Sequence, residues 1–397
     1  METVALAQAP VVARVRTRAA LPWYCYTVIC GATSIIIGIL WDISWHRTIG
    51  RDTFWTPAHM AIYLGGLLGG LTSSWLVLRM TFRGTPEEKA GAVRCWGFHG
   101  PLGAWVCIWG ALAMLTSAPF DDWWHNAYGL DVKILSPPHT VLALGMWGVV
   151  LGALMMVLRA QNLAPPDQPA PGRWLFIYAS GVLVAMAAVF LIEYSWPNHQ
   201  RTRTFYQLSA ATYPVYLIGM ARASKFRWGA TLIAGVYMAV MALSCWILPL
   251  FPGRPLLGPI YNPVDRFVTL AFPLLLVVPA FFVDLLRGWI GHGRGWRRDW
   301  LLVLLAGPAF LATFFVAQWF FSAFLLSPAA ENWFFAADRH WDFSDPPGDW
   351  HKRFWHEGNS QWNPPVTWSG IGWAVLWAVC ATRVGLWLGN WMARVQR

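Results

Sequence analysis

The sequence predicts an all-α, polytopic integral membrane protein with about ten transmembrane helices, arranged as five hairpins with outer-face connections. Of its 397 residues, 57% are hydrophobic and 12% are charged, about half the charged fraction of an ordinary soluble domain. Apolar runs of about 20 residues, long enough to cross a bilayer, recur along the whole chain. Each backbone polar group in lipid needs a partner within the protein, so only helices and closed barrels span a membrane. Barrel strands are about ten residues long, so the longer runs found here favour helices.

The connections between the apolar runs alternate in charge. Those rich in Lys and Arg are expected to face the cytoplasm, together with both termini. The remaining connections then lie at the outer, periplasmic face of a bacterial inner (cytoplasmic) membrane. The net charge of +10 therefore has a membrane explanation, and no nucleic-acid partner is expected. The ten expected spans are 22–42, 57–79, 101–120, 137–158, 174–195, 205–222, 229–250, 266–287, 300–326 and 366–388.

Composition and motifs divide the chain into five regions. The first is a cytoplasmic N-terminal arm, and the second holds two helical hairpins that share a motif. Further transmembrane helices, an outer segment rich in Trp and His, and a last transmembrane helix with a cytoplasmic tail follow. These regions are 1–21, 22–158, 159–326, 327–365 and 366–397.

The first hairpin carries a motif that the second repeats. Each copy reads Asp-x-x-Trp-His, then Gly-x-Asp, then Thr or Ser, Pro and a closing His. The Asp and the first His are four residues apart, so on a helix they lie on one face, one turn apart. Each copy thus offers a carboxylate and two imidazoles, a typical set of metal ligands. The candidate ligands are Asp42, His46 and His59 in the first copy and Asp121, His125 and His139 in the second.

A capping residue followed by Pro precedes the closing His of each copy, at Thr56-Pro57 and Ser136-Pro137. Such a pair is typical of a helix start, which places the closing His in the first turn of the second helix. Each hairpin is therefore expected to close an Asp-His-His site with an open position. The same signal at Asn262-Pro263 and Asn363-Pro364 predicts two further helix starts.

Imidazole and carboxylate ligands suit copper, iron and zinc, and Cu(II) binds such a set most tightly among the first-row divalent ions. Asp52 and Asp131 are expected to accept hydrogen bonds from the imidazoles; alternatively, Asp52 pairs with Arg47 or Arg51. Trp45 and Trp124 precede the first His of each copy and are expected beside the ligands. A competing interpretation treats these residues as part of an interfacial belt of Trp and His.

A degenerate third copy follows at Glu193 and His199. These two residues form either an additional metal site or a structural ion pair with Arg201 or Arg203. The second interpretation is favoured.

The first copy resembles the C subunit of the copper membrane monooxygenases, the particulate methane and ammonia monooxygenases. The resemblance rests on Asp42-x3-His46-x12-His59, with Arg51-Asp52-Thr53 and Thr56-Pro57 between. It implies that this set forms a copper site. It extends over roughly residues 38–145, and no cupredoxin domain like that of the family's B subunit is visible in the chain.

The second copy resembles the family's second site, which consists of Asn, His and His. Here Asp121 stands in place of the family's Asn, with His125 and His139 as the other two ligands. The resemblance implies a neighbouring copper site, with one more negative charge than the family has.

The leading hypothesis is a copper-dependent membrane oxidoreductase, monooxygenase-like, acting with O2 on a small apolar substrate. Its expected partners are membrane lipid, a quinol or other redox partner, and either further subunits or copies of itself. The alternatives are a non-catalytic copper-handling protein, for transport, acceptance or assembly, and a membrane zinc hydrolase.

Overall fold

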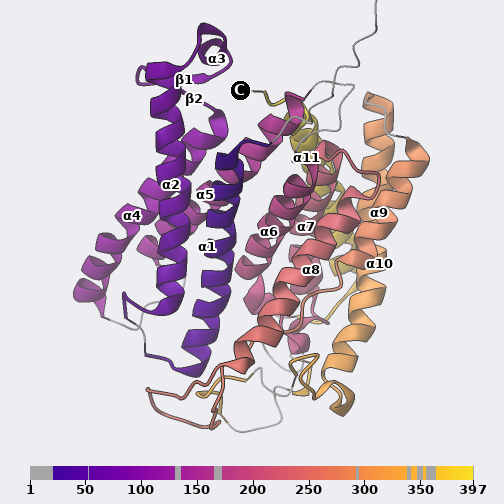
Figure 1. Ribbon diagram of the computed structural model, residues 1–397. Helices are drawn as coiled ribbons and strands as arrows, with labels where there is room; N and C mark the ends of the chain where they lie inside the picture. The colour runs from indigo at the N-terminus through magenta and orange to yellow at the C-terminus, as the bar shows by residue number, and fades with distance from the viewer. Residues whose placement is uncertain are drawn as a thin grey trace, which may run out of the picture.

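The computed structural model describes residues 21–51, 53–129, 136–164, 172–291, 295–337, 341–346, 352–354 and 364–396. This part of the chain is all-α apart from one short β-hairpin (Figure 1). Eight of its helices are long and apolar enough to cross a membrane, which confirms the predicted class. They are α1 (Trp23–Thr48), α2 (Pro57–Arg83), α4 (Leu102–Tyr128), α5 (Pro137–Asn162), α6 (Arg173–Phe190), α8 (Gly229–Ile247, continued by η3), α10 (Trp296–Leu325) and α11 (Trp368–Met392).

The shorter or more polar elements connect and complete the bundle. At the upper end of Figure 1, α3 and the antiparallel pair β1–β2 join α2 to α4. The helix α7 packs along α11, and α9 packs against α8 and α10. These elements are α3 (Pro86–Ala90), β1 (Val93–Cys95), β2 (Phe98–Gly100), η1 (Ile192–Tyr194), η2 (Pro197–His199), α7 (Arg203–Ala223), η3 (Leu248–Leu250), α9 (Val277–Ile290) and η4 (Pro328–Ala330).

The two motif-bearing hairpins, α1–α2 and α4–α5, pack in the same way. A Cβ added to Gly65 of α2 would lie 2.5 Å from the carbonyl oxygen of Gly31 in α1. A Cβ added to Gly110 of α4 would lie 2.6 Å from the carbonyl oxygen of Gly145 in α5. Glycine on both helices permits this approach of the backbones, a device common in membrane helix pairs. The hairpins also pack on each other, α2 against α4 and α1 against α5.

The expected helix at 266–287 is only half helical. Residues 267–275 form neither helix nor strand, Leu276 lies in a turn, and α9 begins at Val277. Pro273 explains much of the difference, since it lacks an N–H and disfavours the helical conformation of the residue before it. The non-helical segment 266–276 is nevertheless largely buried, with Val268, Thr269 and Leu270 at most 2% exposed.

Side chains from three helices form hydrogen bonds with the backbone of this segment. Thr48 of α1 accepts the N–H of Val268 at 2.8 Å, and Ser44 donates to the carbonyl oxygen of the same residue. At the other end of the segment, Tyr237 of α8 accepts the N–H of Leu274 at 3.2 Å. Gln318 of α10 accepts the next N–H at 3.0 Å. Polar side chains thus replace the hydrogen bonds that a helix would have supplied.

Two of the four expected helix starts are wrong. No helix begins after Asn262, whose amide instead donates to the carbonyl oxygens of Asp342 and Asp345 at 2.9 and 3.0 Å. The last helix begins at Trp368, because the Thr367 hydroxyl caps it by accepting the N–H of Gly370. The expected N-terminal arm, 1–21, lies almost wholly outside the described residues, as does much of 327–365.

Candidate metal centre

Both candidate ligand sets lie at one end of the bundle, where α1 connects to α2 and α4 connects to α5. This is the lower end in Figure 1. The Thr56 hydroxyl caps α2 by accepting the N–H of His59, and the Ser136 hydroxyl does the same for His139 at the start of α5, each at 3.4 Å. The cap fixes the first turn of each second helix, so its His is held against the end of the preceding helix.

In the first set, the Asp42 carboxylate lies between the two imidazoles. Its Oδ1 is 3.2 Å from Nε2 of His59, and its Oδ2 is 3.9 Å from Nε2 of His46. His59 comes from α2 and the other two side chains from α1. Asp42 and His59 are about one fifth exposed, whereas His46 is 48% exposed.

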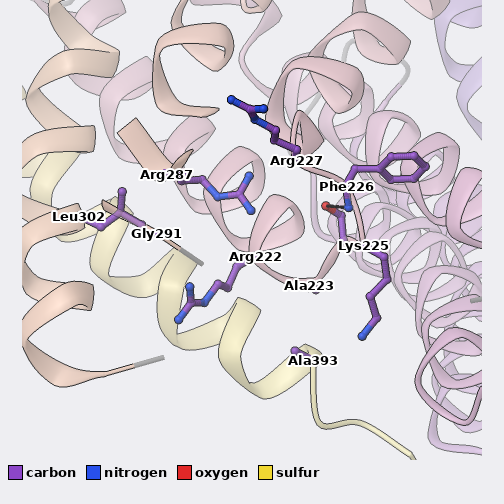
Figure 2. A pocket seen from close by; sticks show the side chains of 10 residues that line it. Arg222, Ala223, Lys225, Phe226, Arg227, Arg287, Gly291, Leu302 and Ala393 are labelled. Atoms are coloured by element: carbon purple, nitrogen blue, oxygen red, sulfur yellow. Dashed lines mark hydrogen bonds between the residues drawn. The ribbon is translucent and has the colours of Figure 1, made fainter. Parts of the chain in front are cut away.

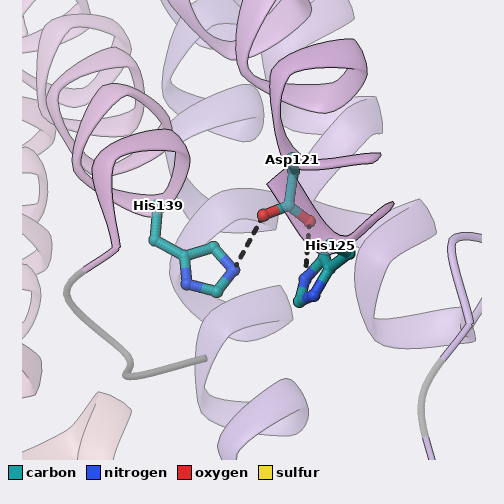
Figure 3. A group of neighbouring side chains, drawn as sticks. All are labelled: Asp121, His125 and His139. Atoms are coloured by element: carbon teal, nitrogen blue, oxygen red, sulfur yellow. Dashed lines mark ion pairs between the residues drawn. The ribbon is translucent and has the colours of Figure 1, made fainter. Parts of the chain in front are cut away.

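The second set repeats this arrangement (Figure 3). Oδ1 of Asp121 is 3.4 Å from Nε2 of His139, and Oδ2 is 3.4 Å from Nε2 of His125. One ligand atom from each of the three side chains lies within 4.8 Å of the other two. The three side chains are between one quarter and two fifths exposed, so a ligand in the open position has access.

Three of these four distances, at 3.2–3.4 Å, fit two ligands of one metal ion, whereas the 3.9 Å between Asp42 and His46 is longer. Two ligands that each lie about 2.0–2.1 Å from one tetrahedral ion are about 3.3–3.4 Å apart. Oδ1 of Asp42 and Oδ1 of Asp121 are buried, yet neither has a hydrogen-bond partner within the described chain, although an imidazole nitrogen lies 3.2–3.4 Å from each. Close atoms that are not aligned for a hydrogen bond are expected where both point their lone pairs at a common ion.

Backbone carbonyl groups set the tautomer of one imidazole in each set. Nδ1 of His59 lies 3.1 Å from the carbonyl oxygen of Thr53, and Nδ1 of His125 lies 3.2 Å from that of Gly129. A carbonyl oxygen only accepts, so Nδ1 donates and Nε2 keeps its lone pair in the neutral ring. In both sets this lone-pair nitrogen is the one that faces the carboxylate, which is the arrangement a metal-binding His needs.

No family model, curated protein or solved structure matches this chain. The resemblance to the copper membrane monooxygenases therefore stays a prediction.

Segments of the C-terminal half pack on the end of α1, the helix that carries Asp42 and His46. Arg47, which follows His46 in the sequence, pairs with Asp342 and lies 4.2 Å from the ring of Trp196. The N–H groups of Leu256 and Phe343 donate to carbonyl oxygens at the end of α1, at 2.9 and 3.3 Å. Two remote segments thus hold the helix end that carries Asp42 and His46.

The second set has less cover. A Cβ added to Gly129, at the end of α4, would meet no atom within 4 Å in the described chain. Trp123 and Tyr128, which flank His125 in sequence, are 55% and 67% exposed. Both sets therefore place an Asp between two His, but among the described residues only the second brings all three ligand atoms within 4.8 Å of one another, and the two differ in what surrounds them.

The remaining expected residues lie as follows. Asp52 and Asp131 lie outside the described residues. Trp45 donates from Nε1 to the carbonyl oxygen of Arg51 at 3.1 Å and packs on Phe267. Trp124 packs on Tyr128, with ring centroids 4.4 Å apart.

Glu193 and His199 contact each other through the backbone. Nδ1 of His199 lies 2.8 Å from the carbonyl oxygen of Glu193, not from its carboxylate. Arg201 stacks on the rings of Trp319 and Phe354 and donates to the Trp319 carbonyl oxygen. Burial lowers the pKa of His199, and the contact with the Glu193 carbonyl partly opposes that shift.

Sequence reasoning missed the carbonyl acceptors of Thr53 and Gly129. Any residue type offers a carbonyl, so only a prediction of the connection's path would have found them. It also missed Tyr63, one turn after His59, whose ring centroid lies 6.0 Å from that of His59. The signal that would have identified Tyr63 is its four-residue spacing from a candidate ligand on the same helix.

Proposed function

We propose that this chain is a copper-dependent membrane oxidoreductase, monooxygenase-like, that acts with O2 on a small apolar substrate. The observation that carries the proposal is the repeated geometry at one end of the bundle. In both hairpins a buried carboxylate oxygen lies 3.2–3.4 Å from an imidazole Nε2 without accepting a hydrogen bond within the described chain. An N/O ligand set of this kind favours Cu(II) over the other divalent first-row ions.

The side chains have separate parts in this proposal. Asp42, His46 and His59 hold one copper ion, and Asp121, His125 and His139 hold another. The carbonyl groups of Thr53 and Gly129 orient two of the rings, and the N-caps place the closing His of each set. Bound copper supplies the one-electron chemistry that activates O2. Electrons come from a quinol or another redox partner, and further subunits or copies of the chain complete the enzyme.

The proposed topology has ten crossings in five hairpins, with the copper sites at the periplasmic face and both termini in the cytoplasm. Eight crossings are the long apolar helices, and α7 is the ninth. The tenth combines the non-helical residues 266–276 with α9. Lys and Arg gather in the connections at the end opposite the candidate sites, which supports this orientation.

Copper content tests the proposal directly. Protein from its native membrane is expected to hold about two copper ions per chain, with nitrogen ligation in its paramagnetic resonance spectrum. The His59→Ala and His139→Ala variants are each expected to lose one ion, and the double variant both. His99→Ala, at the other end of the bundle, is the matched control and keeps both ions. Unchanged copper in the double variant would refute the ligand assignment.

The same samples separate the alternatives. Zinc in place of copper would favour a hydrolase, with hydrolytic activity lost in both single variants. Copper that is bound and released without O2 consumption would favour a copper-handling protein. O2-dependent oxidation of short alkanes or ammonia by the copper-loaded wild type, lost in the double variant, supports the oxidoreductase.

A further inference from the structure

A second polar region lies at the end of the bundle opposite the candidate metal sites. A cavity of about 300 Å³ opens there between the ends of α7, α9, α10 and α11. Figure 2 shows the side chains that line it, including three arginines and a lysine. Cationic side chains in the lining are Arg222, Lys225, Arg227 and Arg287, and none of the described lining residues is acidic.

Two of the arginines are held in place from behind. Arg222 donates to Asp299 and Asn390 at 3.1 and 3.0 Å. Arg287 donates to Asp284 and to the carbonyl oxygen of Ala221. Their side chains are 9% and 7% exposed. These bonds fix both guanidinium groups at the cavity without placing a carboxylate in its lining.

The other two cations give the cavity its excess charge. Lys225 and Arg227 are exposed and lie on the connection that follows α7. Neither has an ion pair with another described residue, and Arg227 lies 5.5 Å from the ring of Trp228. Four cations thus face two carboxylates, and the local charge is +2. This charge favours an anionic ligand, and the arginine fork matches phosphate oxygens best.

Two exposed tryptophans, close in the sequence to a residue of the cavity lining, indicate the depth of the cavity in the membrane. Trp289 near the end of α9 and Trp296 at the start of α10 are 75% and 72% exposed, on either side of Gly291, which lines the cavity. Tryptophan concentrates at the boundary between headgroups and acyl chains. Phe226 and Leu302 add apolar surface to the lining. The cavity therefore combines phosphate-binding groups with a position at headgroup level.

We propose that this cavity binds the phosphate group of an anionic phospholipid. Basic pockets between transmembrane helices at the cytoplasmic side are suited to such headgroups. Lys225 and Arg227 provide the electrostatic attraction, and the two buried arginines provide directed hydrogen bonds. This site is independent of the copper proposal, since it lies at the other end of the bundle.

The test compares lipid binding by the Lys225→Ala/Arg227→Ala double variant with that of the wild type. Both residues are exposed, so the variant keeps the buried ion pairs and is expected to fold. The control is Lys89→Ala/Arg94→Ala, which removes the same charge from α3 and β1 at the same end of the bundle. Each protein is reconstituted in phosphatidylcholine vesicles that contain spin-labelled phosphatidylglycerol, and the motionally restricted lipid is measured.

The wild type is expected to prefer phosphatidylglycerol over spin-labelled phosphatidylcholine. The preference should fall about 25-fold in the Lys225/Arg227 variant, since each of the two basic residues near the surface contributes about fivefold, and it should change little in the control. An equal loss in both variants, or no preference in the wild type, would overturn the proposal. Inorganic phosphate that binds the detergent-purified protein without any lipid preference would assign the cavity to a soluble phosphate ligand and overturn it too.

Discussion

Oδ1 of Asp42 lies 3.2 Å from Nε2 of His59, and this buried oxygen accepts no hydrogen bond from any described residue. The two side chains come from different helices of one hairpin, and His46 lies farther away, at 3.9 Å, with 48% of its side chain exposed. The contribution of the two imidazoles to metal binding should therefore differ.

His59→Ala should weaken metal binding at the first set more than His46→Ala does. The His59 ring is anchored by a carbonyl group and lies closer to the carboxylate, so its loss removes a preorganised ligand. The loss should exceed the roughly 10–100-fold in affinity that an outer partner of a metal ligand costs. Competition with a copper chelator measures both affinities. A larger loss in His46→Ala would contradict the geometry described above.

Removing a helix cap should lower stability at each of three helices, but it should weaken metal binding only at the two helices that carry a candidate ligand. Thr56→Ala, Ser136→Ala and Thr367→Ala each remove a hydroxyl that accepts an N–H in the first turn of a helix. Each should lower the free energy of unfolding by about 1 kcal/mol. Only the first two should also weaken metal binding, because Thr367 caps α11, which carries no candidate ligand. Thermal unfolding and chelator competition on the same samples provide the comparison.

Close packing of α4 on α5 should be needed for the second set. A methyl group at position 110 would lie 2.6 Å from backbone atoms of α5, so Gly110→Ala should force the helices apart at a cost of about 1–3 kcal/mol. It should also lower metal affinity at Asp121, His125 and His139 alone. Gly235→Ala and Gly372→Ala are matched controls, since a Cβ there meets no described atom within 4 Å. Equal effects in all three variants would show that the contact is not what matters.

Gln318 should be among the costliest polar side chains to replace. It is fully buried, accepts the N–H of Leu275 and donates to Gln200 at 2.6 Å. Gln318→Leu leaves that backbone N–H without a partner and should cost about 1–3 kcal/mol. Gln207→Leu is the control. Its acceptor, the Gly370 carbonyl, lies in the first turn of α11, where carbonyl groups also accept hydrogen bonds within the helix. A chemical denaturation series should show the larger loss for Gln318.

Stability should fall on mild acidification because of His199. Burial lowers the pKa of this side chain below its usual 6.5, so the unfolded chain takes up a proton first as the pH falls. The stability that the neutral His199 side chain contributes is fully present above its usual pKa, and it is lost as the pH falls toward the lower pKa of the folded chain. His199→Gln should therefore flatten the unfolding midpoint between about pH 7.5 and about pH 5.5. Glu193→Gln keeps the carbonyl partner and should retain the wild-type slope.

The helical class and the two hairpins were predictable because their signals are local. Apolar length gave the helices, and the pair Thr-Pro or Ser-Pro before a closing His placed the starts of α2 and α5 at the observed residues. At Asn262 the same signal failed, because its amide found acceptors at Asp342 and Asp345, far away in the sequence. Local signals cannot anticipate such remote partners.

The basic cavity and the non-helical conformation of residues 266–276 were not predicted for the same reason. Arg222 and Arg287 come together only once α7 and α9 are packed. A largely apolar run such as 266–276 does not by itself distinguish a helix from a buried non-helical segment. Pro273 was the one signal in this run against a continuous helix. The ligand sets themselves were predictable as sets, because a four-residue spacing and a helix start place all three side chains without any remote information.

Residues 266–276 also constrain the order in which the chain assembles. Their peptide groups depend on side chains of α1, α8 and α10, and lipid offers no substitute for these partners. The helix α10 follows this segment in the chain, so the segment emerges from synthesis before one of its partners exists. It must therefore stay outside the hydrocarbon until α10 has inserted, so residues 266–276 take their place between the helices only after α10.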